Sequence, residues 1–256
     1  MPAVFLTEPS AVPAGTAVAR AEIGALLDVV TADNEVILVS VDPQGAAAAR
    51  AARFATGNVQ VGLLPLIAPP TLVFVLSAVA ALVPDFAMGY LPNVFARTRH
   101  YTRTFAALGS VRGLAHPQPS RSMLRRAALG GGPYVVDWQT QSVTAGKTVT
   151  LPQHAWAVTA SSANPPAVTR RGWPDQPVHL GSESSFWGAS RWLEVTAVSQ
   201  APEAIIGSLF AFIPPDAVQC RSCARICGGQ VCPFCQVRHD DHMPQDPSKL
   251  AMNGAG

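Results

Sequence analysis

The sequence predicts an α+β protein with a helical or mixed N-terminal region, an antiparallel β-sandwich or barrel-like middle, and a small C-terminal zinc-binding knot. Three observations predict this class. Of the 256 residues, 48% are hydrophobic, which is enough to bury a core. Short β-like segments separated by turn residues fill the middle, and two paired-cysteine motifs lie near the C-terminus. The expected segments are residues 1–90, 91–215 and 216–256. Because only 13% of the residues are charged, an intrinsically disordered chain is excluded.

The N-terminal segment alternates between helical and extended patterns. Residues 17–30 and 45–55 predict helices, and residues 35–41 predict a strand between them. A further strand within 58–67 would complete a βαβ unit. Since no G-x-G-x-x-G sequence occupies the strand-to-helix turn, nothing supports a dinucleotide site.

An uncharged stretch follows between Arg53 and Asp85 and superficially resembles a transmembrane segment. Prolines at 65, 69 and 70 interrupt it and leave only the 13 residues Thr71–Val83 unbroken. A helix of that length is too short to cross a bilayer. We therefore predict a buried core segment rather than a membrane span.

The middle of the chain predicts several short strands. Five segments are rich in β-branched and aromatic side chains and are separated by Gly, Pro, Asn and Ser. They are residues 134–138, 148–151, 154–160, 185–199 and 204–213. This spacing favours the sandwich or barrel. The five tryptophans all fall in this region, and we expect them to pack in the core rather than to stack on bases.

Two cysteine pairs give the clearest chemical signal. In CRSCARICGGQVCPFC, each pair has the form Cys-x-x-Cys, and eight residues separate the pairs. Four thiolates about 2.3 Å from a Zn²⁺ ion form a closed tetrahedral site without an open position for catalysis. The spacing predicts a structural Zn²⁺ site with the ligands Cys220, Cys223, Cys232 and Cys235.

The ligand set has alternatives. Cys227 together with His239 or His242 could replace some of the four ligands, and the absence of glycine after Cys223 or Cys235 leaves the subtype of the site open. Disulfides are disfavoured because the cysteines number five, which is odd. Since this segment has little apolar content, zinc would act as the staple that lets it fold.

A basic stretch gives the second signal. Residues 86–174 hold ten bases and the single acid Asp137, and Ser120 is placed to cap a short helix that ends near Gly130. Uncompensated arginines attract polyanions, so we predict contacts with RNA or another polyanion. The alternative is that they pair with acidic segments of the chain or with a neighbouring subunit. The predicted nucleic-acid-binding residues are Arg97, Arg99, Arg103, Arg112, Arg121, Arg125 and Arg126.

No catalytic motif is found. Gly146-Lys147-Thr148 matches the end of a phosphate-binding loop, but Gln141 stands where its first glycine should be, and a strand pattern follows. The chain lacks G-x-S-x-G and H-E-x-x-H, and the histidines before the cysteine segment are isolated. We therefore predict that the protein is not an enzyme.

The low charge and the segments AVPAGTAVAR and ASSANPPAV resemble viral structural proteins, in particular the Pro-Ala-Ser-rich proteins that coat the double-stranded RNA genomes of polymycoviruses. This resemblance implies genome association and self-assembly. The resulting hypothesis is a capsid, clamp or genome-coating subunit that forms large homo-oligomers or co-assembles with another structural protein, in a virion or host cytoplasm. The alternative hypothesis is a monomeric zinc-ribbon adaptor or regulator that binds nucleic acid.

Overall fold

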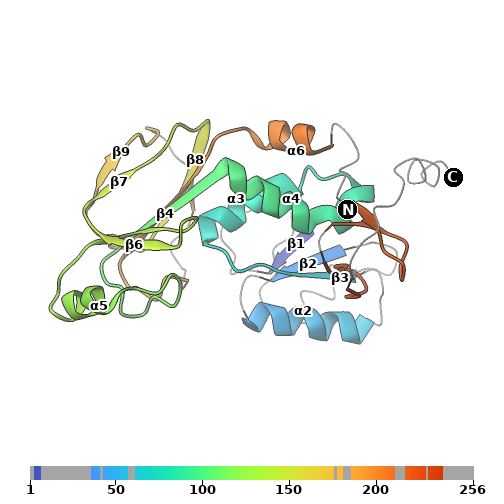
Figure 1. Ribbon diagram of the computed structural model, residues 1–256, viewed down its shortest axis with the longest axis horizontal. Helices are drawn as coiled ribbons and strands as arrows, with labels where there is room; N and C mark the ends of the chain where they lie inside the picture. Colours follow the sequence, from blue (N-terminus) through green and yellow to red (C-terminus); the bar gives the residue numbers. More distant parts are fainter. Residues whose placement is uncertain are drawn as a thin grey trace. The chain divides into compact units, whose positions relative to one another are not determined.

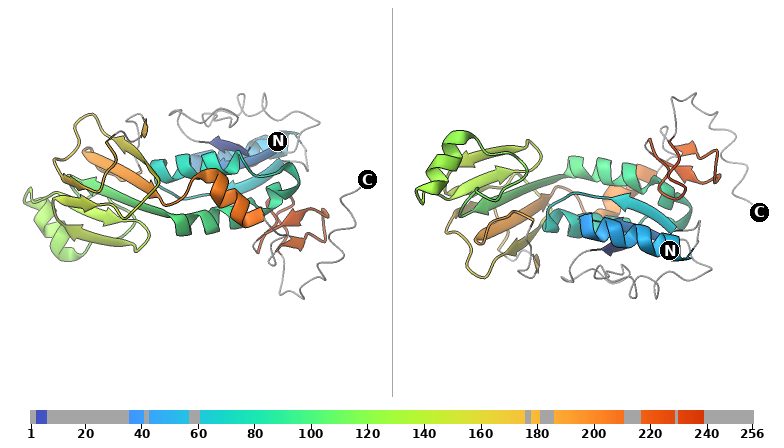
Figure 2. Two further views of the ribbon diagram at one scale, coloured as in Figure 1. Left: turned by 90° about the horizontal axis from the view of Figure 1, so that it is seen from above. Right: turned by 90° about the horizontal axis from the view of Figure 1, so that it is seen from below.

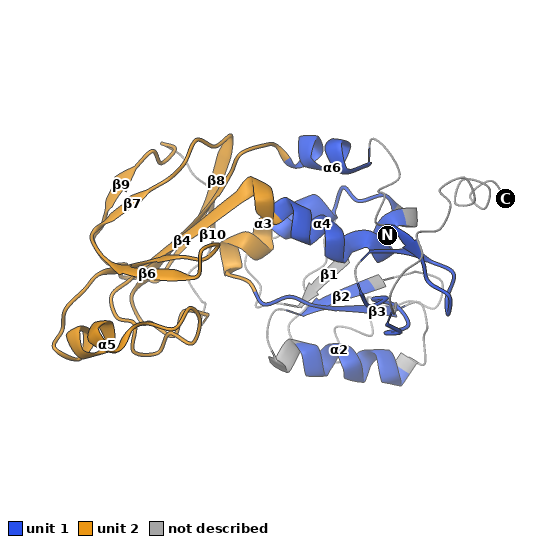
Figure 3. Ribbon diagram, viewed as in Figure 1, with its two compact units in different colours: residues 1–67, 76–98, 202–256 blue, residues 68–75, 99–201 orange. Residues whose placement is uncertain are grey.

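The computed structural model describes residues 3–6, 36–40, 43–56, 61–175, 178–180, 186–210, 217–228 and 230–238. The chain divides into two compact units (Figure 3). Unit 1 comprises residues 1–67, 76–98 and 202–256, and unit 2 comprises residues 68–75 and 99–201. The helix expected at 17–30 lies outside the described residues, and the division into 1–90, 91–215 and 216–256 stays a prediction.

Unit 1 contains a parallel three-stranded sheet in the order β1-β2-β3. Its strands are β1 (Ala3–Leu6), β2 (Val36–Ser40) and β3 (Val61–Pro65). The helix α2 (Pro43–Thr56) connects β2 to β3 and lies along one face of the sheet (Figure 1). The predicted strand, helix and second strand are thus confirmed as a βαβ unit. The buried alanines of α2, Ala48, Ala49 and Ala52, let the helix backbone approach the strands closely.

The helical part of unit 1 explains the uncharged stretch. It contains η1 (Asp85–Tyr90), α4 (Leu91–Thr98), α6 (Pro202–Phe210) and the later part of α3 (Pro70–Ala80). Leu76 and Val79 in this part of α3 are fully buried, as are Leu72 and Val75 in the part that belongs to unit 2, as predicted for a core segment. Among the described residues, no helix has the length and apolar character needed to span a membrane.

Unit 2 is built on a six-stranded sheet in the order β10-β8-β11-β4-β5-β6. All neighbours pair antiparallel except β10 and β8. A parallel ribbon of β7 and β9 accompanies the sheet, and the short helices η2 (Arg99–Tyr101) and α5 (Arg121–Ala128) complete the unit. The strands are β4 (Thr102–Leu108), β5 (Tyr134–Asp137), β6 (Ser142–Ala145), β7 (Thr148–Thr150), β8 (Trp156–Ser161), β9 (Thr169–Arg171), β10 (Val178–Leu180) and β11 (Trp192–Val198).

The prediction that the middle of the chain forms a β-sandwich or barrel is wrong. The described residues of unit 2 form one open six-stranded sheet, and the β7–β9 ribbon covers only part of one of its faces. Val149 and Leu151 from the ribbon pack on Leu193, Val195 and Ala197 of β11. Because β7 and β9 have three residues each, the ribbon is too short to form a second full layer. The coarser prediction of a mixed α and β protein with a cysteine cluster is confirmed.

One predicted strand is a helix. Residues 204–213 were expected to be extended because of their isoleucines and phenylalanines, but 202–210 form α6. Pro202 occupies the first helical position, where its missing N–H costs nothing, and Glu203 follows in the first turn. Ile205, Ile206 and Leu209 are buried on one face. The spacing of these residues is helical, and short apolar segments do not distinguish the two periods reliably.

Local expectations in unit 2 are met. The Ser120 side chain accepts a hydrogen bond from the Met123 N–H at the start of α5, and Gly130 adopts a positive φ of 76° just after its end. Trp187 and Trp192 are buried in the core. The indole N–H groups of half-buried Trp156 and Trp173 donate to backbone carbonyls, which agrees with a packing role.

Candidate metal centre and buried polar network

Four cysteines of unit 1 come together in the segment that follows α6. The sulfur atoms of Cys220, Cys223, Cys232 and Cys235 all lie within 4.8 Å of one another. The Cys220 and Cys235 sulfurs are 3.4 Å apart, and those of Cys223 and Cys232 are 3.6 Å apart. A tetrahedron of sulfurs around zinc has edges of about 3.8 Å, whereas a disulfide requires about 2.0 Å. The four cysteines are free thiols in an arrangement that could hold a metal ion.

Both cysteine pairs sit on turns of the same design. The Cys220 carbonyl accepts the N–H of Ala224, and the Cys232 carbonyl accepts the N–H of Gln236. The N–H of Cys220 donates to the Arg225 carbonyl. In the same way, the N–H of Cys232 donates to the carbonyl of Val237, which is also five residues further along the chain. Ala224 and Gln236 each have a φ of 60°. The chain therefore makes two matching knuckles without the glycine that normally takes this left-handed position.

The cysteine segment packs closely on other parts of unit 1 (Figure 2). The Leu63 N–H in β3 donates to the Pro233 carbonyl at 2.7 Å, and Phe234 is buried with 1% exposure. At η1, a β-carbon added to Gly89 would lie 2.3 Å from the carbonyl oxygen of Ile226 in β13 (Ile226–Cys227). β13 pairs with β12 (Val218–Gln219). The absence of a side chain at 89 thus allows this approach.

The fifth cysteine lies beside the group rather than within it. The Cys227 thiol is fully buried and donates to the Cys232 sulfur at 3.4 Å. It is not part of the set in which every sulfur lies within 4.8 Å of the others. His239 and His242, the other alternative ligands, lie outside the described residues.

Two of the thiols, those of Cys220 and Cys232, are poorly placed to ionise without a cation. Burial raises the pKa of the Cys220 thiol to about 12, and the hydrogen bond from Cys227 together with burial raises the pKa of Cys232. A bound divalent cation reverses this preference because it stabilises thiolates directly.

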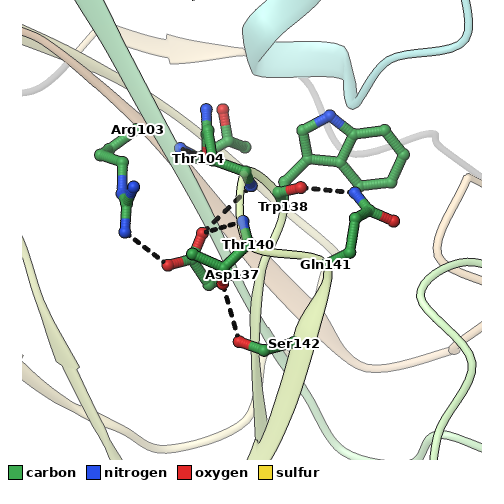
Figure 4. Close-up of polar contacts among 8 residues, drawn as sticks. Arg103, Thr104, Asp137, Trp138, Thr140, Gln141 and Ser142 are labelled. Atoms are coloured by element: carbon green, nitrogen blue, oxygen red, sulfur yellow. Dashed lines mark hydrogen bonds and ion pairs between the residues drawn. The ribbon is translucent and has the colours of Figure 1, made fainter. Parts of the chain in front are cut away.

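The predicted arginines lie on several different elements. Arg97 lies in the last turn of α4 in unit 1. The other six are distributed in unit 2 over η2, β4, the loop before α5, and α5 itself. Arg121 and Arg125 lie one turn apart on α5 and are exposed. Arg103 is not free: its guanidinium pairs with Asp137 at 2.9 Å (Figure 4). The partner is the single acid of the basic stretch itself, whereas the alternative interpretation expected acids of the flanking acidic segments or of a neighbouring subunit.

A second polar group, which the sequence analysis missed, lies buried in unit 2. The Glu194 carboxyl on β11 accepts the Thr71 N–H at 2.6 Å and the Thr71 hydroxyl at 2.5 Å, and its other oxygen accepts the Trp187 indole N–H at 2.5 Å. Thr71 also contacts Thr196, and Thr196 contacts Thr104, through hydroxyls 2.7 and 2.8 Å apart. Burial raises the pKa of Glu194 to about 7, although the three hydrogen bonds oppose this shift.

No signal in the sequence marks Glu194 as special. It is one acid in an alternating strand, and Thr71 is 123 residues away. The nearest hint is the APPT sequence before the core helix, where Thr71 sits in the first turn of α3. A helix N-terminus favours a carboxylate, but the sequence does not show which acid arrives there.

The comparisons with known proteins give no match by sequence. No family model matches, and no curated protein matches. Among solved structures, the chain is similar to a DegV family protein from Eubacterium eligens loaded with heptadecanoic acid, with 13% identity, a TM-score of 0.46, and coverage of 70% of this chain and 78% of that one. It is also similar to the Streptococcus pneumoniae fatty acid kinase (Fak) B3 protein loaded with linoleic acid, with 12% identity, a TM-score of 0.42, and coverage of 70% and 76%.

A third similar structure is a DegV family protein from Corynebacterium glutamicum, with 12% identity, a TM-score of 0.43, and coverage of 70% and 80%. At TM-scores below 0.5, these likenesses assign neither a family nor a ligand to this chain.

These findings correct the functional hypotheses. The similar structures are bacterial DegV family and fatty acid kinase proteins, two of them loaded with a fatty acid, and none of the three is described as a coat or RNA-binding protein. The resemblance to polymycovirus coat proteins is therefore wrong, as are the capsid function, the nucleic-acid adaptor, the RNA and coat-subunit partners, and the virion or host location. An Ala- and Pro-rich composition does not specify a fold. The prediction that the chain is not an enzyme is unaffected.

Proposed function

We propose that Cys220, Cys223, Cys232 and Cys235 bind one Zn²⁺ ion and that this ion has a structural role. The single observation that carries the proposal is the pair of matching knuckles, which bring four sulfurs within 4.8 Å of one another. Tetrahedral sulfur sites are typical of zinc or of iron bound by sulfur. Zinc fits best here because four protein thiolates complete its tetrahedron and leave no open position for chemistry.

The surroundings support a structural role. β12 and β13 have two residues each, so the segment has almost no regular structure of its own to hold it together. Its few buried apolar contacts include Phe234, over which the Arg225 guanidinium lies at 4.4 Å from the ring centre. A metal ion would close the loop between the two knuckles and hold the segment against β3 and η1. In small segments of this kind, the free energy of metal binding is the free energy of folding.

Cys227 would support the site without binding the metal. Its S–H donates to the Cys232 sulfur. In the metal-free chain, contact with Cys227 raises the pKa of Cys232, but once a cation holds Cys232 as a thiolate, the same bond would fix the orientation of that ligand. The proposal therefore distinguishes the fifth cysteine from the other four, although all five lie within the same 16 residues.

The test is metal analysis of the full chain, purified without chelator, with a matched pair of substitutions. We expect about one zinc per chain in the wild type and in Cys227→Ser, and loss of most of the zinc in Cys223→Ser. Mass spectrometry of the native protein would report whether the same chains carry the ion. Wild-type protein without metal, or with cysteines oxidised to disulfides, would overturn the proposal. Loss of zinc from Cys227→Ser but not from Cys223→Ser would establish the alternative ligand set.

A further inference from the structure

A cavity of about 390 Å³ lies in unit 2 at one end of strands β4 and β11. It is a site that none of the motifs predicted, and its size is at the lower end of the range for small-molecule sites. The residues that line it include Arg99 and His100 from η2, Arg103 from β4, Gln139 from the turn after β5, and Ser199 after β11.

The backbone around the cavity is fixed by the sheet. The Tyr101 carbonyl accepts both the N–H and the hydroxyl of Ser199, at 2.8 and 3.2 Å. Thr102 and Arg103 of β4 pair with Val198 and Ala197 of β11. The lining side chains therefore project from paired strands and from the residues that lead directly into them, so the site is held on a rigid frame.

Gln139 is the unusual member of the lining. Its Oε1 accepts the Thr104 N–H at 2.8 Å, which continues the hydrogen bonding of β4 one step beyond the end of β5. Its Nε2 is buried and has no hydrogen-bond partner among the described residues. Leaving a buried amide donor unpaired is costly. Since Nε2 has almost no accessible surface, it could gain a bond from a ligand only by turning toward the cavity that Gln139 lines.

The charges at the cavity are positive. Arg99 pairs with no carboxylate among the described residues, and partial burial lowers the pKa of its guanidinium while leaving much of the side chain accessible. No acid lines the cavity. The nearby carboxylate of Asp137 is occupied, since one oxygen pairs with Arg103 and the other accepts the N–H groups of Gln139 and Thr140 (Figure 4). Figure 4 also shows the Thr140 hydroxyl held by Ser142, which keeps this turn closed.

We propose that this cavity binds the oxyanion group of a small molecule, a phosphate or a carboxylate, through Arg99 and His100, and that the Gln139 amide turns toward the bound anion so that its unpaired Nε2 donates to it. Each of these groups offers N–H donors to an acceptor, and a guanidinium matches the planar pairs of oxygens on either anion. The hydroxyls of Ser199 and Thr102 already donate to backbone carbonyls, so they contribute little to recognition of the anion. Asp137 would keep Arg103 oriented toward the site while limiting the net positive charge.

Gln139→Glu gives the sharpest variant. Glutamate has the same length and keeps an oxygen to accept the Thr104 N–H, but it replaces the donor with a negative charge. Arg99→Gln removes the guanidinium. The matched control is Arg121→Gln, which removes an exposed arginine on α5 outside the cavity lining. Circular dichroism and thermal unfolding would verify that all three variants fold.

The experiment titrates the full zinc-loaded chain with inorganic phosphate and, separately, with acetate at constant ionic strength, followed by amide NMR shifts of residues 99–103 and 139. We expect saturable binding of at least one anion, weakened tenfold or more by Gln139→Glu and by Arg99→Gln and unchanged by Arg121→Gln. Binding of phosphate alone would identify a phosphoryl ligand, and binding of acetate would identify a carboxylate. Absence of saturable binding, or equal weakening by all three substitutions, would overturn the proposal. Because this outcome is independent of zinc content, it leaves the metal site separately testable.

Discussion

The cysteine segment of unit 1 and the Glu194 network of unit 2 both gather polar groups away from water, but they do so in opposite ways. The four metal-binding candidates come from 16 consecutive residues and meet through two local turns. Glu194 meets a partner 123 residues away and depends on β11 and α3 for its position. By our proposal, the first arrangement is stabilised by an ion, whereas both carboxyl oxygens of Glu194 already accept hydrogen bonds from the protein. Removal of a metal should therefore affect the cysteine segment, and a change of pH should affect the Glu194 network.

Metal removal should give the largest effect. A strong chelator should abolish the hydrogen-exchange protection of the knuckle amides of Cys220, Ala224, Cys232 and Gln236, because the ion contributes on the order of 10 kcal/mol to segments of this type. The β4 and β11 amides of unit 2 should keep their protection. Knuckle protection that survives complete metal removal would show that the segment folds by packing alone.

A change of pH should act on unit 2. The pKa of Glu194 is raised from 4.5 to about 7 in the folded chain, so the folded state holds the proton more tightly than the unfolded state does. Glu194 therefore contributes about 3 kcal/mol to the free energy of unfolding. This contribution is fully present below pH 4.5 and is lost as the pH rises through 7. Denaturant unfolding between pH 4 and 8 measures it. Glu194→Gln mimics the protonated form and should remove this part of the pH dependence, and an unchanged slope in that variant would refute the assignment.

Gly89→Ala should destabilise unit 1 by roughly 2 kcal/mol, because the new methyl would overlap the Ile226 carbonyl and crowd the Cys227 sulfur. Chemical unfolding with zinc in excess provides the measurement. Gly146→Ala is the control, since nothing lies within 4 Å of a β-carbon there. Equal stability of the two variants would mean that β13 does not need to approach η1 so closely.

The smallest effect is expected at the knuckles themselves. Ala224→Gly should stabilise the metal-bound form by about 0.5 kcal/mol, because glycine adopts the φ of 60° without strain. Gln236→Gly should not show this gain, because the Gln236 side chain also donates to the Pro233 carbonyl at 2.7 Å and to the Leu63 carbonyl at 3.2 Å. Thermal unfolding in excess zinc compares the two, and a gain in both variants would show that the side-chain bonds contribute little.

Local patterns were predicted well where one segment determines its own structure. The βαβ unit, the cap at Ser120 and the strands β5, β7, β8 and β11 follow from periodicity and turn residues. The strands β4, β6, β9 and β10 were not predicted. α6 was predicted as a strand because its short apolar segment fits both periods, and its burial pattern against the rest of unit 1 decides in favour of a helix. The resemblance to coat proteins failed because it was based on composition, which carries no information about which residues meet.

The sequence by itself determined the cysteine spacing, and with it the candidate metal site, because a turn of four residues brings its two thiols together whatever surrounds it. It also determined the positive charge of the middle segment. Only the tertiary structure decided which of those charges are paired, which cysteine stays outside the group of four, and that Glu194, Gln139 and Arg99 occupy special positions. The physical reason is that burial and long-range pairing, unlike local turns, depend on strands and helices that meet from distant parts of the chain.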